Sequence, residues 1–156
     1  MPRFPQQSGI KCDDECVTAF NTFKLQNSQK GEIFRFLVFR IKDEKVKLVH
    51  KEKADAKATD AAEWQKFCET LKGDKKDGAY GVYDMKTTSK DDRQIAKVIF
   101  VSWSPDDIPI KPRMLYGSTK ESFKQALGSG IAYVLQASSM ADLDYKDVQK
   151  MVATGR

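Results

Sequence analysis

The chain has 156 residues, of which 40% are hydrophobic and 31% are charged, and its net charge is +5. This length favours one domain with a continuous core, and no apolar run approaches the ~20 residues of a membrane-spanning helix, so we expect no transmembrane segment. The first seven residues lack the apolar stretch of a secretory signal, which predicts a cytoplasmic location. The positive net charge favours an acidic partner, which could be a nucleic acid, a lipid headgroup or a protein.

The chain contains three cysteines, Cys12, Cys16 and Cys68. They cannot all pair with one another, and a chain of this size does not need disulfides to complete its core, so we expect reduced thiols. The sharper alternative is a zinc site that these cysteines form with His50. Because the candidate ligands are scattered and no CxxC pair is present, we expect no metal and no cofactor.

The first expected helix follows Asp13 and Asp14, since Val17, Phe20 and Phe23 recur at a three-residue spacing after an acidic first turn. A β-branched and aromatic strand is expected over residues 32–41. In that strand Phe34, Phe36 and Val38 are predicted to face one side of the sheet, and Ile33, Leu37, Phe39 and Ile41 the other.

Residues 97–103 repeat this pattern, so the middle of the sheet is expected to be apolar on both faces. The predicted fold is therefore α/β, a three-layer α/β/α sandwich in which a central mixed sheet is flanked by helices on both faces. Further helices are expected from Thr59 or Asp60 to Leu71, where Trp64 and Phe67 turn inward, and over residues 112–127 and 141–152. Further strands are expected over residues 46–49 and 133–136, and another strand begins with residues 79–84. Residues 86–93 are expected to form the tip of a hairpin.

The expected helix at 112–127 has a basic stripe. On a helical wheel Arg113, Lys120 and Lys124 fall within about 40° of one another, and Lys111 adds a cation just before the helix. The opposing arc, which we predict to face the core, holds Met114, Leu115, Phe123 and Ala126. Such a stripe is often only a solvated surface, so it does not by itself establish a binding site.

Several segments together resemble the actin-depolymerising factor/cofilin family. They are residues 102–106 (SWSPD), 110–120 (IKPRMLYGSTK), the N-terminal Ser8-Gly9-Ile10, Tyr80-Gly81-Val82-Tyr83-Asp84 and residues 131–137. The resemblance extends over everything from Ser8 onward. It divides the chain into an N-terminal extension, residues 1–7, which we expect to be flexible, and one actin-binding domain, residues 8–156.

The resemblance implies two contacts with actin and a monomeric protein that depolymerises or severs filaments. The site for actin monomers would comprise Ser8, Gly9, Ile10, Lys111, Arg113, Met114, Ser118 and Lys120. The site for filaments would comprise Arg93, Lys97 and Lys150. Filament-binding relatives carry arginine late in the last helix, whereas this sequence reads QKMVATGR over residues 149–156, so we expect the filament site to be the weaker one.

The resemblance also implies regulation. Ser8 corresponds to the regulatory serine of the family, although here it follows seven residues; a phosphate on it would place about two negative charges beside the basic helix. Phosphoinositide headgroups are implied as an inhibitory ligand of the same basic helix, with about 1 kcal/mol for each lysine near an anionic surface.

The sequence also bears on two other classes of function. An enzyme is not expected, because the only histidine, His50, lies in a lysine-rich strand and Gly128-Ser129-Gly130 follows a helix, where a phosphate-binding loop would follow a strand. A basic nucleic-acid-binding module is the alternative that the charge favours. It would require exposed aromatic side chains on the sheet, and both faces of the central strands are predicted to be buried.

Overall fold

The computed structural model describes residues 10–25, 33–55, 57–73, 76–88 and 91–154. Within these ranges six strands form one mixed sheet in the order β1-β3-β2-β4-β5-β6. The strands are β1 (Lys11–Cys12), β2 (Phe34–Lys42), β3 (Lys45–Lys53), β4 (Ala79–Thr88), β5 (Gln94–Trp103) and β6 (Tyr133–Ala137). The two outermost pairs, β1–β3 and β5–β6, are parallel, and the inner pairs are antiparallel.

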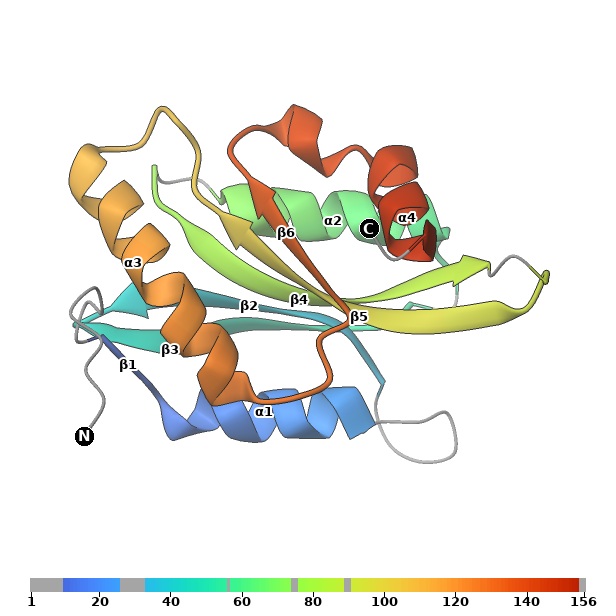
Figure 1. Cartoon of the computed structure of the whole chain (residues 1–156), viewed down its shortest axis with the longest axis horizontal. Helices are drawn as coiled ribbons and strands as arrows, with labels where there is room; N and C mark the ends of the chain where they lie inside the picture. Colours follow the sequence, from blue (N-terminus) through green and yellow to red (C-terminus); the bar gives the residue numbers. More distant parts are fainter. Residues whose placement is uncertain (1–9, 26–32, 56, 74–75, 89–90, 155–156) are drawn as a thin grey trace.

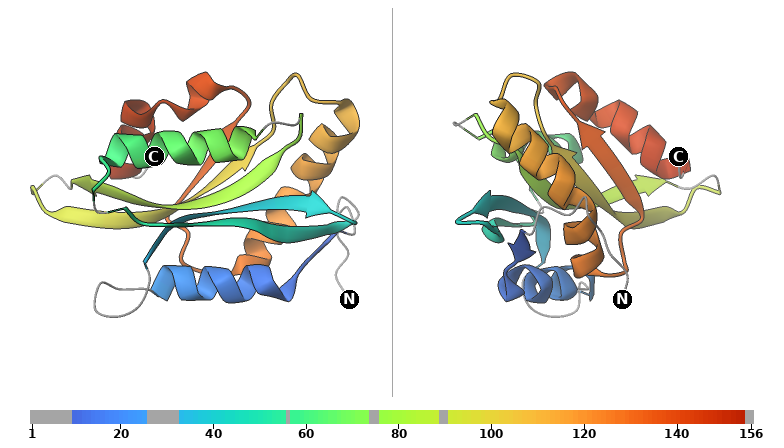
Figure 2. Two further views of the ribbon diagram at one scale, coloured as in Figure 1. Left: turned by 180° about the vertical axis from the view of Figure 1, so that it is seen from behind. Right: turned by 60° about the vertical axis from the view of Figure 1, so that its left-hand side comes forward.

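Helices cover both faces of this sheet (Figures 1 and 2). The helices α1 (Asp14–Leu25) and α3 (Ile110–Leu127) lie on one face, and α2 (Asp60–Lys72) and α4 (Tyr145–Thr154) lie on the other. Phe20 and Phe123 pack with Phe39 on the first face, while Trp64 and Val148 belong to the cluster on the second. The predicted three-layer α/β/α sandwich is confirmed.

The central strand β2 contributes to both clusters, as its sequence predicted, with one exception. Phe36 and Val38 lie on the α2 side and Leu37 and Phe39 on the α1 side, but Phe34 packs with the α1-side cluster and not with Phe36. The pairing of β2 with β3 shifts register between Phe34 and Phe36. An irregularity of this kind breaks the strict alternation of side chains, so the predicted face of Phe34 was wrong.

The long helix α3 begins earlier than predicted and turns a different face inward. It starts at Ile110 rather than Pro112, and Gly128, at φ +87°, follows its last residue. Its buried residues are Tyr116, Thr119, Phe123 and Leu127. Of the residues that were expected to face the core, Phe123 does so, Leu115 is half-buried, and Met114 and Ala126 are exposed.

The C-terminal segment is not the single helix over 141–152 that the sequence predicted. A 3₁₀ helix, η1 (Met140–Leu143), precedes α4, and Asp144 between them has extended backbone angles. Asp142 accepts hydrogen bonds from the backbone of Ser138 and Ser139, which ends β6 and starts η1. The hairpin was also placed too broadly, because β4 continues to Thr88 and β5 begins at Gln94.

Candidate functional site

The exposed face of α3 combines apolar and polar side chains. Ile110 and Met114 are each 67% exposed and lie one helical turn apart. A Cβ added to Gly117 would meet no atom within 4 Å, so the surface next to Met114 is open. Ser118 is exposed, and its Oγ donates to the Leu115 carbonyl at 3.2 Å, a bond within the helix. The apolar part of this face has no cover from the described residues, which suits a protein partner.

The cations of α3 differ in their environments. Lys111 and Arg113 are exposed, and Arg113 Nη1 donates to the Asp106 carbonyl at 3.0 Å. Lys120 is half-buried and its Nζ donates to Gln136 Oε1 at 3.1 Å; burial, and then the charge of Lys124, lower its pKa. The Nζ atom of Lys124 lies 3.4 Å from Oε1 of Glu121. Lys111 and Arg113 are therefore the cations best placed to meet an acidic partner.

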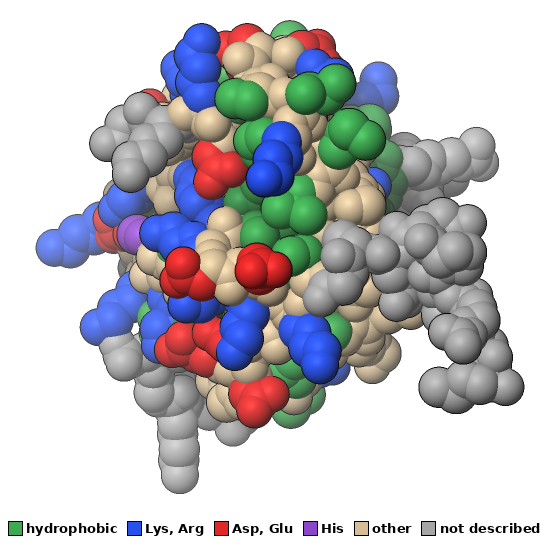
Figure 3. Space-filling view, turned by 90° about the vertical axis from the view of Figure 1, so that its left-hand side faces the viewer, with side chains coloured by type: hydrophobic (Ala, Val, Ile, Leu, Met, Phe, Trp, Pro, Cys, Tyr) green, Lys and Arg blue, Asp and Glu red, His purple; other side chains and the backbone are tan. Residues whose placement is uncertain are grey.

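The start of the described chain lies next to this helix. β1 pairs with β3 and contacts α3, and Ile10, just before β1, is half-buried against the α1-side cluster. The predicted site residues Ser8 and Gly9 lie outside the described residues. Figure 3 views this end of the molecule, where hydrophobic side chains gather in the middle of the face with lysine, arginine and acidic side chains around them.

The residues predicted for filaments lie at the opposite end of the molecule, where the β4–β5 hairpin projects beside α4 (Figures 1 and 2). Arg93 is exposed near the hairpin tip, and its Nε lies 3.2 Å from Asp91 Oδ2. Lys97 Nζ donates to the Val152 carbonyl of α4 at 3.0 Å. Lys150 is exposed on α4. The fold thus brings the predicted hairpin and helix residues into one region.

Sequence reasoning missed Ile110, which was placed before the helix, and the Asp106 carbonyl that holds Arg113. The missed signal for Ile110 was the spacing of Tyr116, Thr119, Phe123 and Leu127, which defines the buried stripe of α3 and leaves Ile110 and Met114 outside it. A backbone carbonyl carries no residue-specific signal, so its role could only come from the structure.

The alternative zinc site is not assembled. Cys16 belongs to the cluster on the α1 side of the sheet, whereas Cys68 belongs to the cluster on the α2 side, and the three cysteines are free thiols. His50 instead contacts Glu52, with Nε2 2.8 Å from Oε1. No group of three or more potential metal ligands occurs among the described residues. Within the same ranges, no helix combines the length and apolar character of a membrane span.

Comparison with known proteins gives the family. Residues 9–153 match the family described as cofilin/tropomyosin-type actin-binding protein. The chain is 35% identical to cofilin of Gibberella zeae, covering 96% of this chain and 97% of that one, and 35% identical to cofilin of Schizosaccharomyces pombe, covering 93% and 96%.

Solved structures of related proteins share the fold. Actin depolymerization factor 2 of Plasmodium berghei superposes with a TM-score of 0.79 at 21% identity, over 94% of this chain and 98% of that one. The ADF-like UNC-60A protein of Caenorhabditis elegans gives 0.76 at 25% identity, over 94% and 96%. The chain therefore belongs to the cofilin/actin-depolymerising factor family.

Proposed function

We propose that this chain binds actin monomers through the exposed face of α3 and the adjoining N-terminal segment, and that it promotes the depolymerisation of actin filaments. The observation that carries the proposal is the exposed pair Ile110 and Met114 beside the cations Lys111 and Arg113, on a helix in contact with β1. Membership of a family of actin-binding proteins supports it. That family, rather than any missing motif, is the reason to regard the chain as a non-enzymatic regulator.

The arrangement has the parts that a specific interface needs. Exposed methionine is an adaptable apolar contact, and Ile110 extends the apolar area along the same face. Cations next to such a patch steer an acidic partner and favour the correct orientation. Because Lys120 is half-buried against Gln136, we assign it an edge position in the interface, with less weight than Lys111 and Arg113.

Filament binding is proposed as the weaker activity, through Arg93, Lys97 and Lys150. Lys97 already donates a hydrogen bond to the Val152 carbonyl, and Arg93 forms an ion pair with Asp91. Arg93 and Lys150 are exposed, and exposed charges contribute little in physiological salt. This surface therefore offers less to a partner than the α3 face does.

Regulation is proposed at the monomer site. A phosphate on Ser8 would bring negative charge toward Lys111 and Arg113 and weaken the approach of an acidic partner. Phosphoinositide headgroups would compete for the same cations. We propose a monomeric protein that acts in the cytoplasm, on the actin cytoskeleton.

The test is a fluorescence titration of labelled actin monomers with the variant Lys111→Ala/Arg113→Ala. Loss of two central cations is expected to weaken binding at least about tenfold, because such contacts commonly contribute about 1–2 kcal/mol each. The matched control is Lys57→Ala, an exposed lysine next to α2 and away from α3. The thermal midpoint of the double variant should stay within about 3 °C of the parent, since exposed side chains contribute little to stability. Unchanged affinity in the double variant would refute the α3 interface.

The nucleic-acid alternative is supported neither by the family nor by the relatives. The structure adds a physical reason. The aromatic side chains of the central strands, including Phe36, Tyr83 and Phe100, are buried beneath helices, so they are not available for stacking on bases.

A further inference from the structure

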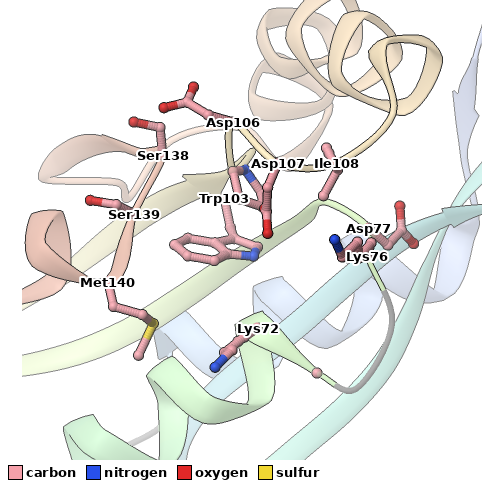
Figure 4. A pocket seen from close by; sticks show the side chains of 12 residues that line it. Lys72, Lys76, Asp77, Trp103, Asp106, Asp107, Ile108, Ser138, Ser139 and Met140 are labelled. Atoms are coloured by element: carbon pink, nitrogen blue, oxygen red, sulfur yellow. The ribbon is translucent and has the colours of Figure 1, made fainter.

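A cavity beside Trp103, at the end of β5, is not part of the proposed actin contact (Figure 4). Its lining carries charges of both signs, from Lys72, Lys76, Asp77, Asp106 and Asp107. Because these charges oppose one another, the lining favours no single class of ligand. A pair of cysteines in the cluster on the other face of the sheet has a more definite chemistry.

Cys12 and Cys16 lie on either side of the junction between β1 and α1. Cys12 is the last residue of β1, Cys16 lies in the first turn of α1, and three residues separate them in the sequence. Figure 1 shows that β1 leads directly into α1 on this side of the sheet. Cys12 is half-buried and Cys16 is buried, and both pack against the same apolar cluster. The fold therefore keeps both thiols at one place.

Two backbone carbonyl groups hold this junction together. The Val46 carbonyl of β3 accepts from the Asp13 amide at 2.9 Å and from the Cys16 thiol at 3.3 Å. The Asp13 carbonyl accepts from the Cys16 amide at 3.0 Å and from the Cys12 thiol at 3.3 Å. Cys12 itself pairs with Val46 in the sheet. Both sulfur atoms are thus fixed to the same short piece of backbone.

The two thiols differ in how easily they ionise. The neighbouring Cys16 thiol lowers the pKa of Cys12, and this effect outweighs burial and the charges of Asp13 and Asp14. The neighbouring Cys12 thiol and burial raise the pKa of Cys16. Cys12 is therefore the thiol that forms a thiolate first, while Cys16 keeps its proton beside it.

A half-buried thiolate next to a second thiol reacts with peroxides in two steps. The Cys12 thiolate attacks one oxygen of hydrogen peroxide, the O–O bond breaks, and hydroxide leaves; Cys12 is oxidised to a sulfenic acid and the peroxide is reduced. The Cys16 sulfur then attacks the Cys12 sulfur, and the S–O bond breaks as the S–S bond forms. The sulfenic hydroxyl departs with the Cys16 proton as water.

We propose that Cys12 and Cys16 form an oxidation site, in which hydrogen peroxide converts Cys12 to a sulfenic acid and Cys16 resolves it to a disulfide within the chain. Cys68 is not available for this step, because it lies in the cluster on the opposite face of the sheet. β1 also contacts α3, so the modified junction lies beside the proposed actin contact, although the inference does not depend on that contact.

The test treats the full reduced chain with hydrogen peroxide, alkylates the remaining thiols and maps the tryptic peptides by mass spectrometry. Trypsin cuts after Lys11 and Lys24, so both cysteines fall on one peptide, residues 12–24, whereas Cys68 falls on residues 67–72. Peptide 12–24 is expected without alkylation and about 2 Da lighter than its reduced form, and dithiothreitol should restore it. An unchanged peptide, a sulfinic acid at Cys12 beside an alkylated Cys16, or a link to peptide 67–72 or to a second chain would refute the site.

A variant tests the role of Cys16. Cys16→Ser removes the resolving thiol, so its Cys12 should stop at the sulfenic acid and take up dimedone at least about fivefold more than in the parent. The matched control is Cys68→Ser, which should form the disulfide as the parent does. Equal dimedone labelling of Cys12 in Cys16→Ser and the parent would show that Cys16 does not resolve the sulfenic acid. Because Cys16 is buried, the thermal midpoint of its variant is measured first; if that variant does not fold, the peptide map of the parent decides alone.

Discussion

The ammonium group of Lys97 in β5 donates a hydrogen bond of 3.0 Å to the backbone carbonyl of Val152, near the end of α4. The last carbonyls of a helix have no partner within the helix, and the helix dipole makes that end negative. Lys97 therefore fastens the last helix to the projecting hairpin, in addition to its proposed place in the filament site.

Replacing this lysine separates the two roles. Lys97→Met keeps the aliphatic stem and removes the charge, so the free energy of unfolding, measured by urea denaturation, should fall by about 1–2 kcal/mol. Arg93→Ala, at an exposed position, should change it by no more than about 0.5 kcal/mol. If Lys97→Met is as stable as Arg93→Ala, the bond to Val152 contributes nothing to the fold.

Filament pelleting should reveal how the two proposed sites differ in strength. With the parent protein, more actin is expected in the supernatant and little of this protein in the pellet, because the filament surface rests on few exposed cations. The pelleted fraction should fall further as salt rises, since charges separated by more than about 8 Å are largely screened at physiological ionic strength. Stoichiometric, salt-resistant co-pelleting would show that other residues complete the filament site.

Two glycines should respond to alanine in opposite directions. At Gly81, in the centre of β4, a Cβ would lie 2.6 Å from Phe67 Cε1, so Gly81→Ala should lower the free energy of unfolding by about 1–3 kcal/mol. At Gly117, inside α3, a Cβ would meet nothing within 4 Å, so Gly117→Ala should raise it by about 0.5–1 kcal/mol. Chemical denaturation of both variants measures this, and a destabilised Gly117→Ala would contradict the open surface beside Met114.

Stability is expected to fall steeply at alkaline pH. Burial raises the pKa of Tyr80, Tyr83 and Tyr116 well above the usual value near 10. Above pH 10 these hydroxyls keep their protons in the folded chain and lose them in the unfolded chain, so unfolding releases protons and is favoured by rising pH. Each such tyrosine contributes a loss of about 1.4 kcal/mol per pH unit.

Tyr80→Phe provides the check, because it removes one of these groups. The variant loses the hydrogen bond from the Tyr80 hydroxyl to the Tyr116 carbonyl and should be less stable by about 1 kcal/mol at pH 7. Its free energy of unfolding should then decline less steeply between pH 10 and 11 than that of the parent. Parallel curves for the two proteins would mean that Tyr80 ionises as easily folded as unfolded.

The three thiols should differ in reactivity. The neighbouring Cys16 thiol lowers the pKa of Cys12, against the opposing effects of burial and nearby aspartates, while burial raises the pKa of Cys68 to about 12. The same pairing, together with burial, raises the pKa of Cys16. Because the thiolate is the reactive form, iodoacetamide at pH 8 should modify Cys12 first. Mass spectrometry of the labelled native protein gives the order in which the three cysteines react, and Cys12→Ser is the control. Early labelling of Cys68 would contradict its burial.

The sequence predicted the three layers of this fold because more than one segment of the chain indicates them. Two strands that are apolar on both faces, β2 and β5, require helices on both sides, and Thr59 supplies a helix start that the structure confirms through its bond to the Ala62 amide. Phe34 was misplaced because an irregularity in strand pairing depends on the neighbouring strand, which the sequence of β2 alone does not contain.

The candidate site was predictable in its residue types and less so in their environments. The stripe of Arg113, Lys120 and Lys124 follows from helix geometry, but the half-burial of Lys120 depends on Gln136 of β6, which is distant in the sequence. Met114 was predicted to face the core because it lies opposite the basic stripe, but the buried residues of α3 are Tyr116, Thr119, Phe123 and Leu127, and Met114 is exposed. The cavity beside Trp103 is lined by three separate segments of the chain, so no local sequence pattern predicts it.

The hydrogen bond from Arg113 to the Asp106 carbonyl has a consequence for the kinetics of association. A free arginine side chain on a surface samples many rotamers, and a partner that uses it must first select one of them. Here the segment before α3 holds the guanidinium in one place while the side chain stays exposed. In the proposed interface, less side-chain entropy would therefore be lost when a carboxylate of the partner binds Arg113, so a larger share of encounters would proceed directly to the bound state.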